Sequence, residues 1–224
     1  MCGRFVQFAG VFEYLEALKP QQELFGGYDN IPIGKYNVAP ATLVKIFCST
    51  ERGISIEASR WGWKPAWAKD NRPPMINARS ETVADSKYFR PIWPHRCVVP
   101  ANGWYEWTGE PGKKQPYYIH LKTEEPMFFA AIGEFSGHVE HDGFVVITAD
   151  AQGGMVDIHD RRPVVLPPAL AREWLDPSTT SKRAKEILEE ASQQSEHFTW
   201  YKVDRAVGNA RNQGERLIKP QNKS

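Results

Sequence analysis

The sequence predicts an α+β fold: a single domain over residues 1–224, built on an antiparallel, barrel-like β-sheet with short flanking helices. Many short runs of apolar and aromatic residues are separated by turn residues, whereas helical patterns are few and no strand-helix period repeats. The 224 residues, 41% hydrophobic and 25% charged, are enough for one core that needs no disulfide or metal.

The helical segments are short. Phe12, Leu15 and Leu18 have helical spacing and predict a first helix over 11–19. Residues 20–40 are rich in Gly, Pro and Asn and, like residues 64–74, are expected to form a loop. Pro168 suits the first turn of a second helix that ends near residue 175, and a third helix is expected over 184–191.

Strand patterns occupy most of the remaining chain. Residues 43–48 and 54–58 are expected to pair across the turn Ser-Thr-Glu-Arg-Gly. Further strands are expected at 97–99, 104–107, 117–121, 127–132, 144–149, 164–166 and 198–203.

Charge and cysteine usage exclude several classes of protein. There are 28 basic and 27 acidic residues, a net charge of +1, which excludes a histone-like nucleic-acid binder. The longest apolar stretch, 127–132, is too short for a membrane span, and we expect a cytoplasmic monomer without a leader. Cys2, Cys48 and Cys97 form no CxxC pair, so we expect a reducing compartment, no metal and no cofactor.

One window, from Arg60 to Arg96, is locally basic and aromatic. It contains eight basic and three acidic residues, together with four of the eight tryptophans, among them Trp67. Cations that meet phosphates and rings that stack on bases would make a groove for unpaired nucleic acid. A solvated face over an aromatic core is the alternative, and the window alone favours it.

The N-terminus offers an unusual nucleophile. The small residue Cys2 permits loss of Met1, and the mature chain would then begin with an amine and a thiol on adjacent carbons. Such an aminothiol can condense with an aldehyde to an imine and close it through sulfur into a thiazolidine. An α-amine has a pKa of about 7.7–8.0, so part of it is neutral at pH 7. The alternative is a small residue near a frayed terminus.

Two further segments carry groups that move protons. In Trp104-Tyr105-Glu106-Trp107, the carboxylate shares a strand face with Trp104, and desolvation there would raise its pKa toward neutrality. A salt-bridged carboxylate at a sheet edge is the alternative. His159 lies between two apolar runs and titrates near physiological pH.

Two polar segments are weaker signals. Residues 77–81, Asn-Ala-Arg-Ser-Glu, could begin a helix with Ser80 as its cap, and they offer the amide of Asn77 and the guanidinium of Arg79. Residues 36–40, Tyr-Asn-Val-Ala-Pro, form a rigid polar loop.

Taken together and in order, these segments resemble the SRAP family, the SOS response-associated peptidase proteins. The resemblance spans nearly the whole chain and rests on residues 2–5, 36–40, 77–81, 103–107, 159–161 and 206–209. It implies a DNA damage response protein that loses Met1, binds abasic sites in single-stranded DNA and caps the exposed aldehyde with Cys2. Many family members have methionine where this chain has Arg162, which puts in doubt only local packing or an added phosphate contact.

The resemblance also implies roles for particular residues. Cys2 would be the nucleophile, Asn77 would orient its amine, Glu106 would move protons and His159 would assist sugar ring opening and the imine steps. The implied DNA contacts are Arg4, Asn37, Pro40, Trp67, Arg79, Trp107, Arg161 and Asn209.

Two other functions use overlapping residues. A thiol peptidase would pair Cys2 with His159 and orient the imidazole with Asn77 or Glu106. A non-covalent single-strand binder would use the 60–96 window and would not need Cys2. Arg79 and Arg161 could likewise pair with internal carboxylates such as Asp160 or Glu81 in place of phosphates.

Overall fold

The computed structural model describes residues 2–18, 31–50, 53–68, 72–110, 112–138, 140–192 and 195–221. Over these residues the chain forms thirteen strands, three α-helices and four 3-10 helices. The predicted loop at 20–30, the tip of the 43–58 hairpin and Met1 lie outside the described residues.

The smaller sheet has five antiparallel strands, and the N-terminal strand lies inside it. Its order is β13 (Phe198–Lys202), β8 (Gln115–Leu121), β7 (Gly103–Thr108), β1 (Phe5–Gln7) and β2 (Lys35–Val38). β1 therefore has a neighbour on each edge, which fixes the start of the chain in the sheet.

The larger sheet has eight strands. Its main path is β11 (Arg161–Pro163), β10 (Gly143–Asp150), β9 (Met127–Glu134), β6 (Arg96–Ala101), β3 (Leu43–Thr50) and β4 (Gly53–Arg60). Off this path, β12 (Val165–Leu166) pairs with β9, and β5 (Asn77–Arg79) pairs with β10 in parallel.

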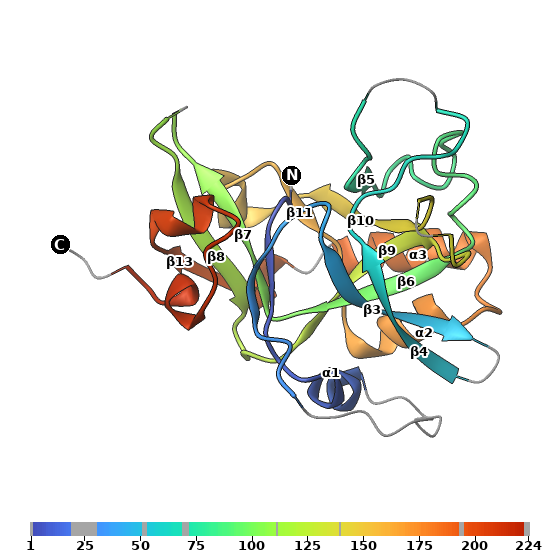
Figure 1. Ribbon diagram of the computed structural model, residues 1–224, viewed down its shortest axis with the longest axis horizontal. Helices are drawn as coiled ribbons and strands as arrows, with labels where there is room; N and C mark the ends of the chain where they lie inside the picture. Colours follow the sequence, from blue (N-terminus) through green and yellow to red (C-terminus); the bar gives the residue numbers. More distant parts are fainter. Residues whose placement is uncertain are drawn as a thin grey trace.

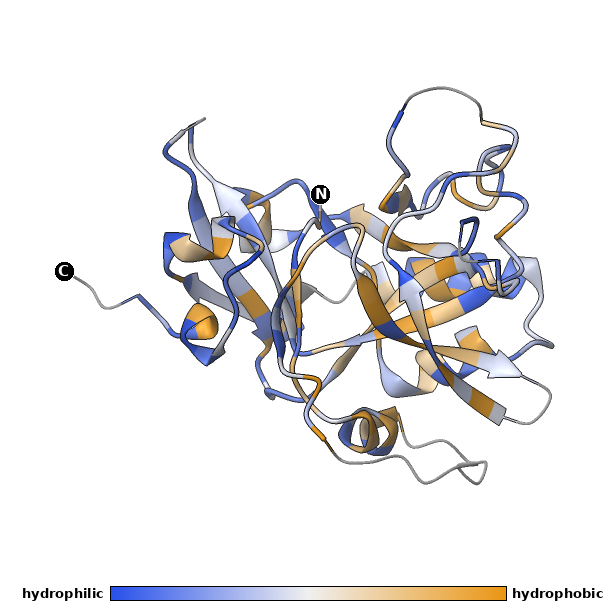
Figure 2. Cartoon of the chain, in the orientation of Figure 1, coloured by the Kyte–Doolittle hydropathy of each residue, from blue (hydrophilic) through white to orange (hydrophobic). Residues whose placement is uncertain are grey.

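The two faces of the larger sheet carry separate parts of the core. Along β9, Phe128 packs with the helices α1 (Val11–Leu18), α2 (Pro168–Leu175) and α3 (Ser181–Ser192). Phe129, the next residue, packs instead with residues of the five-stranded sheet such as Phe5. This alternation follows the period of two in a strand. Figure 1 shows the two sheets side by side with the chain's start between them, and Figure 2 shows the hydrophobic residues concentrated on the strands and helices.

The α+β class with mainly antiparallel strands is confirmed. Among the described residues the pairings do not close a ring, so the sheets are barrel-like only in a loose sense. Two local predictions are wrong. β2 lies within the predicted loop 20–40, and residues 77–79 form a strand where a helix start was expected. The backbone N–H of Ser80 donates to Thr148 O at 2.9 Å, which continues the pairing with β10.

Candidate functional site

The register between β1 and β7 brings the chain's start to the Trp-Tyr-Glu-Trp segment. Phe5 pairs with Trp104, and the N–H of Tyr105 donates to Arg4 O at 3.0 Å. The antiparallel count continued toward the N-terminus places Cys2 beside the Glu106 end of β7. At the other end of β7, Gly103 lets β8 approach closely, because a Cβ there would lie 2.3 Å from a ring carbon of Tyr118.

Cys2 is fully buried. Burial raises the pKa of its thiol well above the usual range, and the nearby charge of Glu106 raises it further. The thiol is therefore protonated at pH 7. This state differs from the lowered pKa that a thiolate nucleophile needs.

Asn77 reaches Cys2 from the larger sheet. β5 holds it opposite Val146 of β10, and its Nδ2 donates to Cys2 O at 2.8 Å. Its Oδ1 is buried and accepts no hydrogen bond from the described part of the chain. The amide is thus fixed at one end and has a free acceptor at the other.

Glu106 has the titration behaviour expected from its neighbours in sequence. Its side chain is 3% exposed, and desolvation raises the pKa to about 7, with a further upward contribution from Asp160. The predicted rise is confirmed. β7 is an interior strand, so the sheet-edge alternative is wrong. At neutral pH the carboxyl group is divided between its acid and base forms.

His159 lies on the turn between the 3-10 helix η1 (Gly153–Asp157) and β11. Thr108, at the end of β7, donates to Asp157 O at 3.4 Å and ties this turn to the strand of Glu106. Met155 of η1 and Ile158, the residue before His159, pack in the same buried cluster as Cys2.

Two contacts and burial set the orientation and the charge of the His159 imidazole. The N–H of Arg161 donates to His159 Nδ1 at 3.0 Å, and Asp160 Oδ1 lies 2.7 Å from the same nitrogen. Burial lowers the pKa of His159, so the ring is neutral at pH 7. Nδ1 thus faces both a backbone N–H and a carboxylate oxygen, and these two contacts fix the orientation of the ring.

Arg161 pairs with internal carboxylates, which was the alternative to a phosphate contact. Its guanidinium donates to Glu81 at 2.8 and 3.0 Å, to Asp150 at 2.5 Å and to Thr148 O at 2.6 Å. These bonds tie β11 to the segment that follows β5, and so hold the turn of His159 close to the strand of Asn77.

Arg4 and Asn37 clamp the C-terminal segment against the smaller sheet. Arg4 donates to Asn37 Oδ1 and to Val207 O, both at 2.9 Å. Asn37, which is buried, donates to Val207 O at 3.1 Å and to Asn209 O at 3.0 Å. Three segments of the resemblance, residues 2–5, 36–40 and 206–209, therefore meet in space.

The remaining predicted contacts are accessible. Arg79 is exposed, and its guanidinium has no hydrogen bond to another described residue. Trp67 is 60% exposed and meets the ring of Tyr88 edge-on. Pro40 and Trp107 are half-buried, and the side chain of Asn209 is at the surface.

Most of the basic-aromatic window is core. Trp61, Trp63, Phe89 and Trp93 are all buried, so the interpretation as an aromatic core is confirmed for these rings. Trp67 is the exception among the tryptophans of the window.

Arg162 makes no surface contact. It is fully buried, its Nη2 donates to Ser192 O at 2.8 Å at the end of α3, and its guanidinium lies over the Phe198 ring. An added phosphate contact at this position is therefore wrong. The guanidinium instead satisfies carbonyls at a helix C-terminus, where a positive charge is favourable.

Sequence reasoning missed Asp150 and Lys114 as neighbours of the site, and it named Asp160 as a partner of the arginines, whereas Arg161 pairs with Glu81 and Asp150. Asp160 contacts His159, and the charge of Lys114 acts on the pKa values of both Glu106 and His159. The contact of Asp160 with His159 could have been found from its place beside the histidine. Lys114 comes from the β7–β8 connection, and no local pattern marks it.

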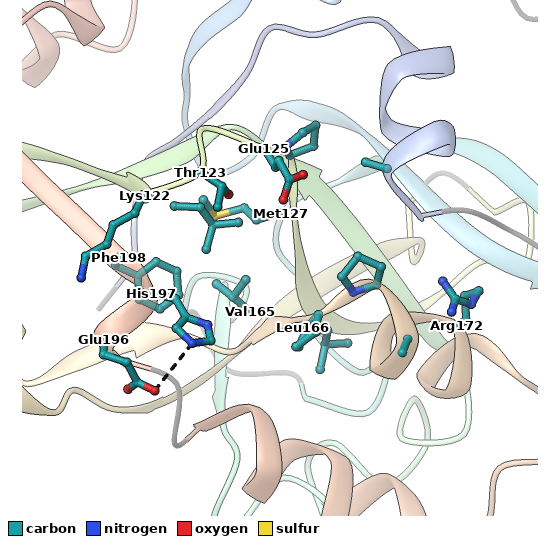
Figure 3. Close-up of a pocket in the computed structure, with 16 residues that line it drawn as sticks. Lys122, Thr123, Glu125, Met127, Val165, Leu166, Arg172, Glu196, His197 and Phe198 are labelled. Atoms are coloured by element: carbon teal, nitrogen blue, oxygen red, sulfur yellow. Dashed lines mark ion pairs between the residues drawn. The ribbon is translucent and has the colours of Figure 1, made fainter.

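A separate cavity lies away from these residues. Its volume is about 710 Å³, and Figure 3 shows Met127, Val165, Leu166 and Phe198 at its apolar part and Lys122, Glu125 and His197 around it. None of the candidate catalytic side chains lines it. The described residues contain no group of three or more His, Cys, Asp or Glu arranged to hold a metal, and no helix in them could cross a membrane.

The fold and site define a class of protein. It is a mixed α+β protein in which Cys2 is buried among residues of both sheets, accepts a hydrogen bond from the amide of Asn77 and lies near Glu106, whose pKa is about 7. The chain belongs to the SOS response associated peptidase (SRAP) family, which matches residues 1–210.

Individual relatives extend the match over the whole chain. The chain is 44% identical to the abasic site processing protein YedK of Escherichia coli (strain K12), over 98% of this chain and 100% of that protein. It is 32% identical to the abasic site processing protein YoqW of Bacillus subtilis (strain 168), over 97% and 99%. A solved phage-related protein from Bordetella bronchiseptica has a TM-score of 0.76 and 39% identity, over 91% of this chain and 95% of that one.

Proposed function

We propose that this protein binds abasic sites in single-stranded DNA and links itself to them through Cys2 once Met1 is removed. The observation that carries the proposal is the 2.8 Å bond from Asn77 Nδ2 to Cys2 O, beside the raised pKa of Glu106. The names of the relatives as abasic site processing proteins support it.

The aminothiol and the lesion are chemically matched, because an abasic sugar in its open form is an aldehyde. The amine of Cys2 adds to the carbonyl carbon, and the resulting carbinolamine loses one water to give an imine. The sulfur then adds to the imine carbon while the thiol proton goes to nitrogen. A five-membered thiazolidine results, and the whole sequence releases one water. At the imine stage the same adduct could lose the 3′ phosphate, as in a lyase.

Each residue of the site has a step in this sequence. Asn77 Oδ1 accepts an N–H of the Cys2 amine, which aims the nitrogen lone pair away from the amide. Glu106, with a pKa of about 7, takes a proton from the attacking amine and returns it to the departing hydroxyl.

His159 and the thiol complete the set. The imidazole of His159 donates a proton to the sugar oxygen during ring opening. The Cys2 thiol is protonated until the imine forms, and Glu106, whose charge raises the pKa of this thiol, is proposed to relay its proton. Hydrolysis of the Met1–Cys2 bond, which adds one water, is proposed to use the same carboxyl group.

We assign the DNA strand to the accessible side chains near the site. Arg79 would meet a phosphate, since a guanidinium fork matches phosphate oxygens, and Trp67 would stack on a base. The internal partners of Arg4 and Arg161 favour a different role for these two, which is to hold the surface in shape.

The test uses Cys2→Ser, which retains an amine but has no sulfur to close the ring. With an abasic oligonucleotide it should give an adduct only when borohydride reduces the imine. Cys48→Ser, which removes a different buried thiol, should crosslink like the parent. A heat-stable adduct of Cys2→Ser without reductant would rule out ring closure through sulfur.

The two alternatives predict different results. A thiol peptidase would retain its activity when the α-amine is blocked, and the raised pKa of the Cys2 thiol counts against it. A non-covalent binder would hold the DNA equally well with and without Cys2 and would form no adduct.

A further inference from the structure

Two of the three cysteines face each other in the larger sheet, away from the proposed chemistry. Cys48 on β3 and Cys97 on β6 are directly paired in the antiparallel register, next to the pair Phe47 and Val98. Both side chains belong to one buried cluster, so they lie on the same face of the sheet. Both are free thiols.

This placement suits a bond between the two sulfurs. Directly opposed residues of an antiparallel pair have Cα atoms about 4.5 or 5.5 Å apart, and disulfides span about 4.4–6.8 Å between Cα atoms. Cys48 and Cys97 are the last pair in the register of β3 with β6. The small backbone shift that brings the two sulfurs together therefore falls at the end of the paired region. Burial raises the pKa of the Cys97 thiol, and a hydrogen bond with the Cys48 thiol raises it further.

Cys48 is the more accessible of the two cysteines. Cys97 is completely buried, whereas Cys48 is 8% exposed and lines a cavity of about 360 Å³. Arg96 and His95 line the same cavity and Glu134 is their acidic neighbour there. A small oxidant can therefore meet Cys48 first, and Cys97 is in place to resolve the product.

We propose that Cys48 and Cys97 are a reversible oxidation site, at which a hydroperoxide converts the two thiols into a cross-strand disulfide. Hydrogen peroxide oxidises the Cys48 thiol to a sulfenic acid and is itself reduced to water. The Cys97 sulfur then attacks the sulfenic sulfur, and the hydroxyl group leaves with the Cys97 proton as a second water. A dithiol reductant reverses the change.

A disulfide between Cys48 and Cys97 would enclose the segment that supplies several of the proposed site residues. The residues between Cys48 and Cys97 include β5 with Asn77 and Arg79, and also Trp67. A disulfide would close this segment into one covalent ring anchored between two paired strands. Such a ring stabilises a fold chiefly by restricting the unfolded chain. Oxidation would therefore protect from unfolding the segment that supplies the proposed DNA contacts.

The experiment treats the full-length protein with hydrogen peroxide, blocks remaining thiols with iodoacetamide and maps unreduced peptides by mass spectrometry. We expect an intact mass lower by two hydrogens before blocking, a peptide pair joined through Cys48 and Cys97, and full reversal by dithiothreitol. The midpoint of urea unfolding should rise on oxidation in the parent. The rise should be absent in Cys48→Ser and in Cys97→Ala and retained in Cys2→Ser.

Other outcomes overturn the proposal. Uptake of oxygen at Cys48 without loss of two hydrogens would mean that Cys97 does not resolve the sulfenic acid. A disulfide that includes Cys2, or an equal rise of the urea midpoint in Cys48→Ser, would place the oxidation elsewhere. Circular dichroism of each reduced variant checks that it is folded. If Cys97→Ala does not fold, Cys48→Ser, at the partly exposed position, supplies the comparison.

Discussion

Glu106→Gln should make the protein more stable at alkaline pH while it slows the proposed reaction. The carboxyl group is 3% exposed, and burial raises its pKa from 4.5 to about 7. The folded state therefore binds a proton more tightly than the unfolded state between these values. The resulting stabilisation is fully present below about pH 4.5 and is lost as the pH rises through about 7.

The magnitude follows from the shift. Each pKa unit corresponds to about 1.4 kcal/mol, so ionisation of the buried group removes on the order of 3 kcal/mol of unfolding free energy by pH 8.5. Glutamine has no proton to lose. The stability of Glu106→Gln relative to the parent should therefore increase by about this amount between pH 4.5 and pH 8.5.

Urea unfolding of both proteins at the two pH values measures this difference. Glu110→Gln, an exposed position shortly after the same strand, is the matched control, because it removes a carboxylate that is not buried. A relative stability of Glu106→Gln that does not change with pH would refute the assigned titration. In the same variant, crosslinking should slow by about a hundredfold to ten-thousandfold in single-turnover kinetics, because the proton relay is lost.

Four further substitutions separate chemistry, DNA binding and structure. His159→Ala should slow crosslinking by about a hundredfold to ten-thousandfold with little change in DNA affinity, and equal single-turnover rates would contradict its role. Arg79→Ala should lower the slope of log affinity against log salt by roughly 0.7 without changing the melting temperature, as titrations at several salt concentrations would show. Arg161→Ala should instead lower the melting temperature, by roughly 2–4 °C for each kcal/mol lost, because Glu81 and Asp150 lose their common partner. If Arg161→Ala instead lowers the slope of log affinity against log salt and leaves the melting temperature unchanged, Arg161 contacts a DNA phosphate. Arg162→Ala should lower the urea midpoint and leave the salt slope unchanged, because the guanidinium is buried at the end of α3.

The long strands and the helices could be predicted because their burial patterns are local. Residues 127–134 and 143–150 are nearly continuous apolar runs, and Pro168 marks the first turn of α2. The strands β1, β2 and β5 have only three or four residues each, and their hydrogen-bond partners are distant in the chain. No local pattern distinguishes such segments from a loop.

The same division applies to the candidate site. The burial of Glu106 could be predicted because Trp104, two residues earlier on the same strand face, is itself fully buried. The pairing of Arg161 with Glu81 and Asp150 brings together three segments, and nothing in the sequence ranks these carboxylates above a phosphate. The burial of Arg162 likewise depends on where α3 ends, 30 residues further along the chain.

The most direct test of the central claim is intact-mass spectrometry of the protein, alone and after incubation with an abasic single-stranded oligonucleotide without reductant. The account predicts a protein that begins at Cys2 and an adduct whose mass is the sum of protein and oligonucleotide less one water. Later treatment with borohydride should leave this mass unchanged, because a thiazolidine has no imine to reduce. Absence of an adduct of the mature protein, or an adduct that gains two hydrogens with borohydride, would contradict the proposed linkage through the amine and sulfur of Cys2.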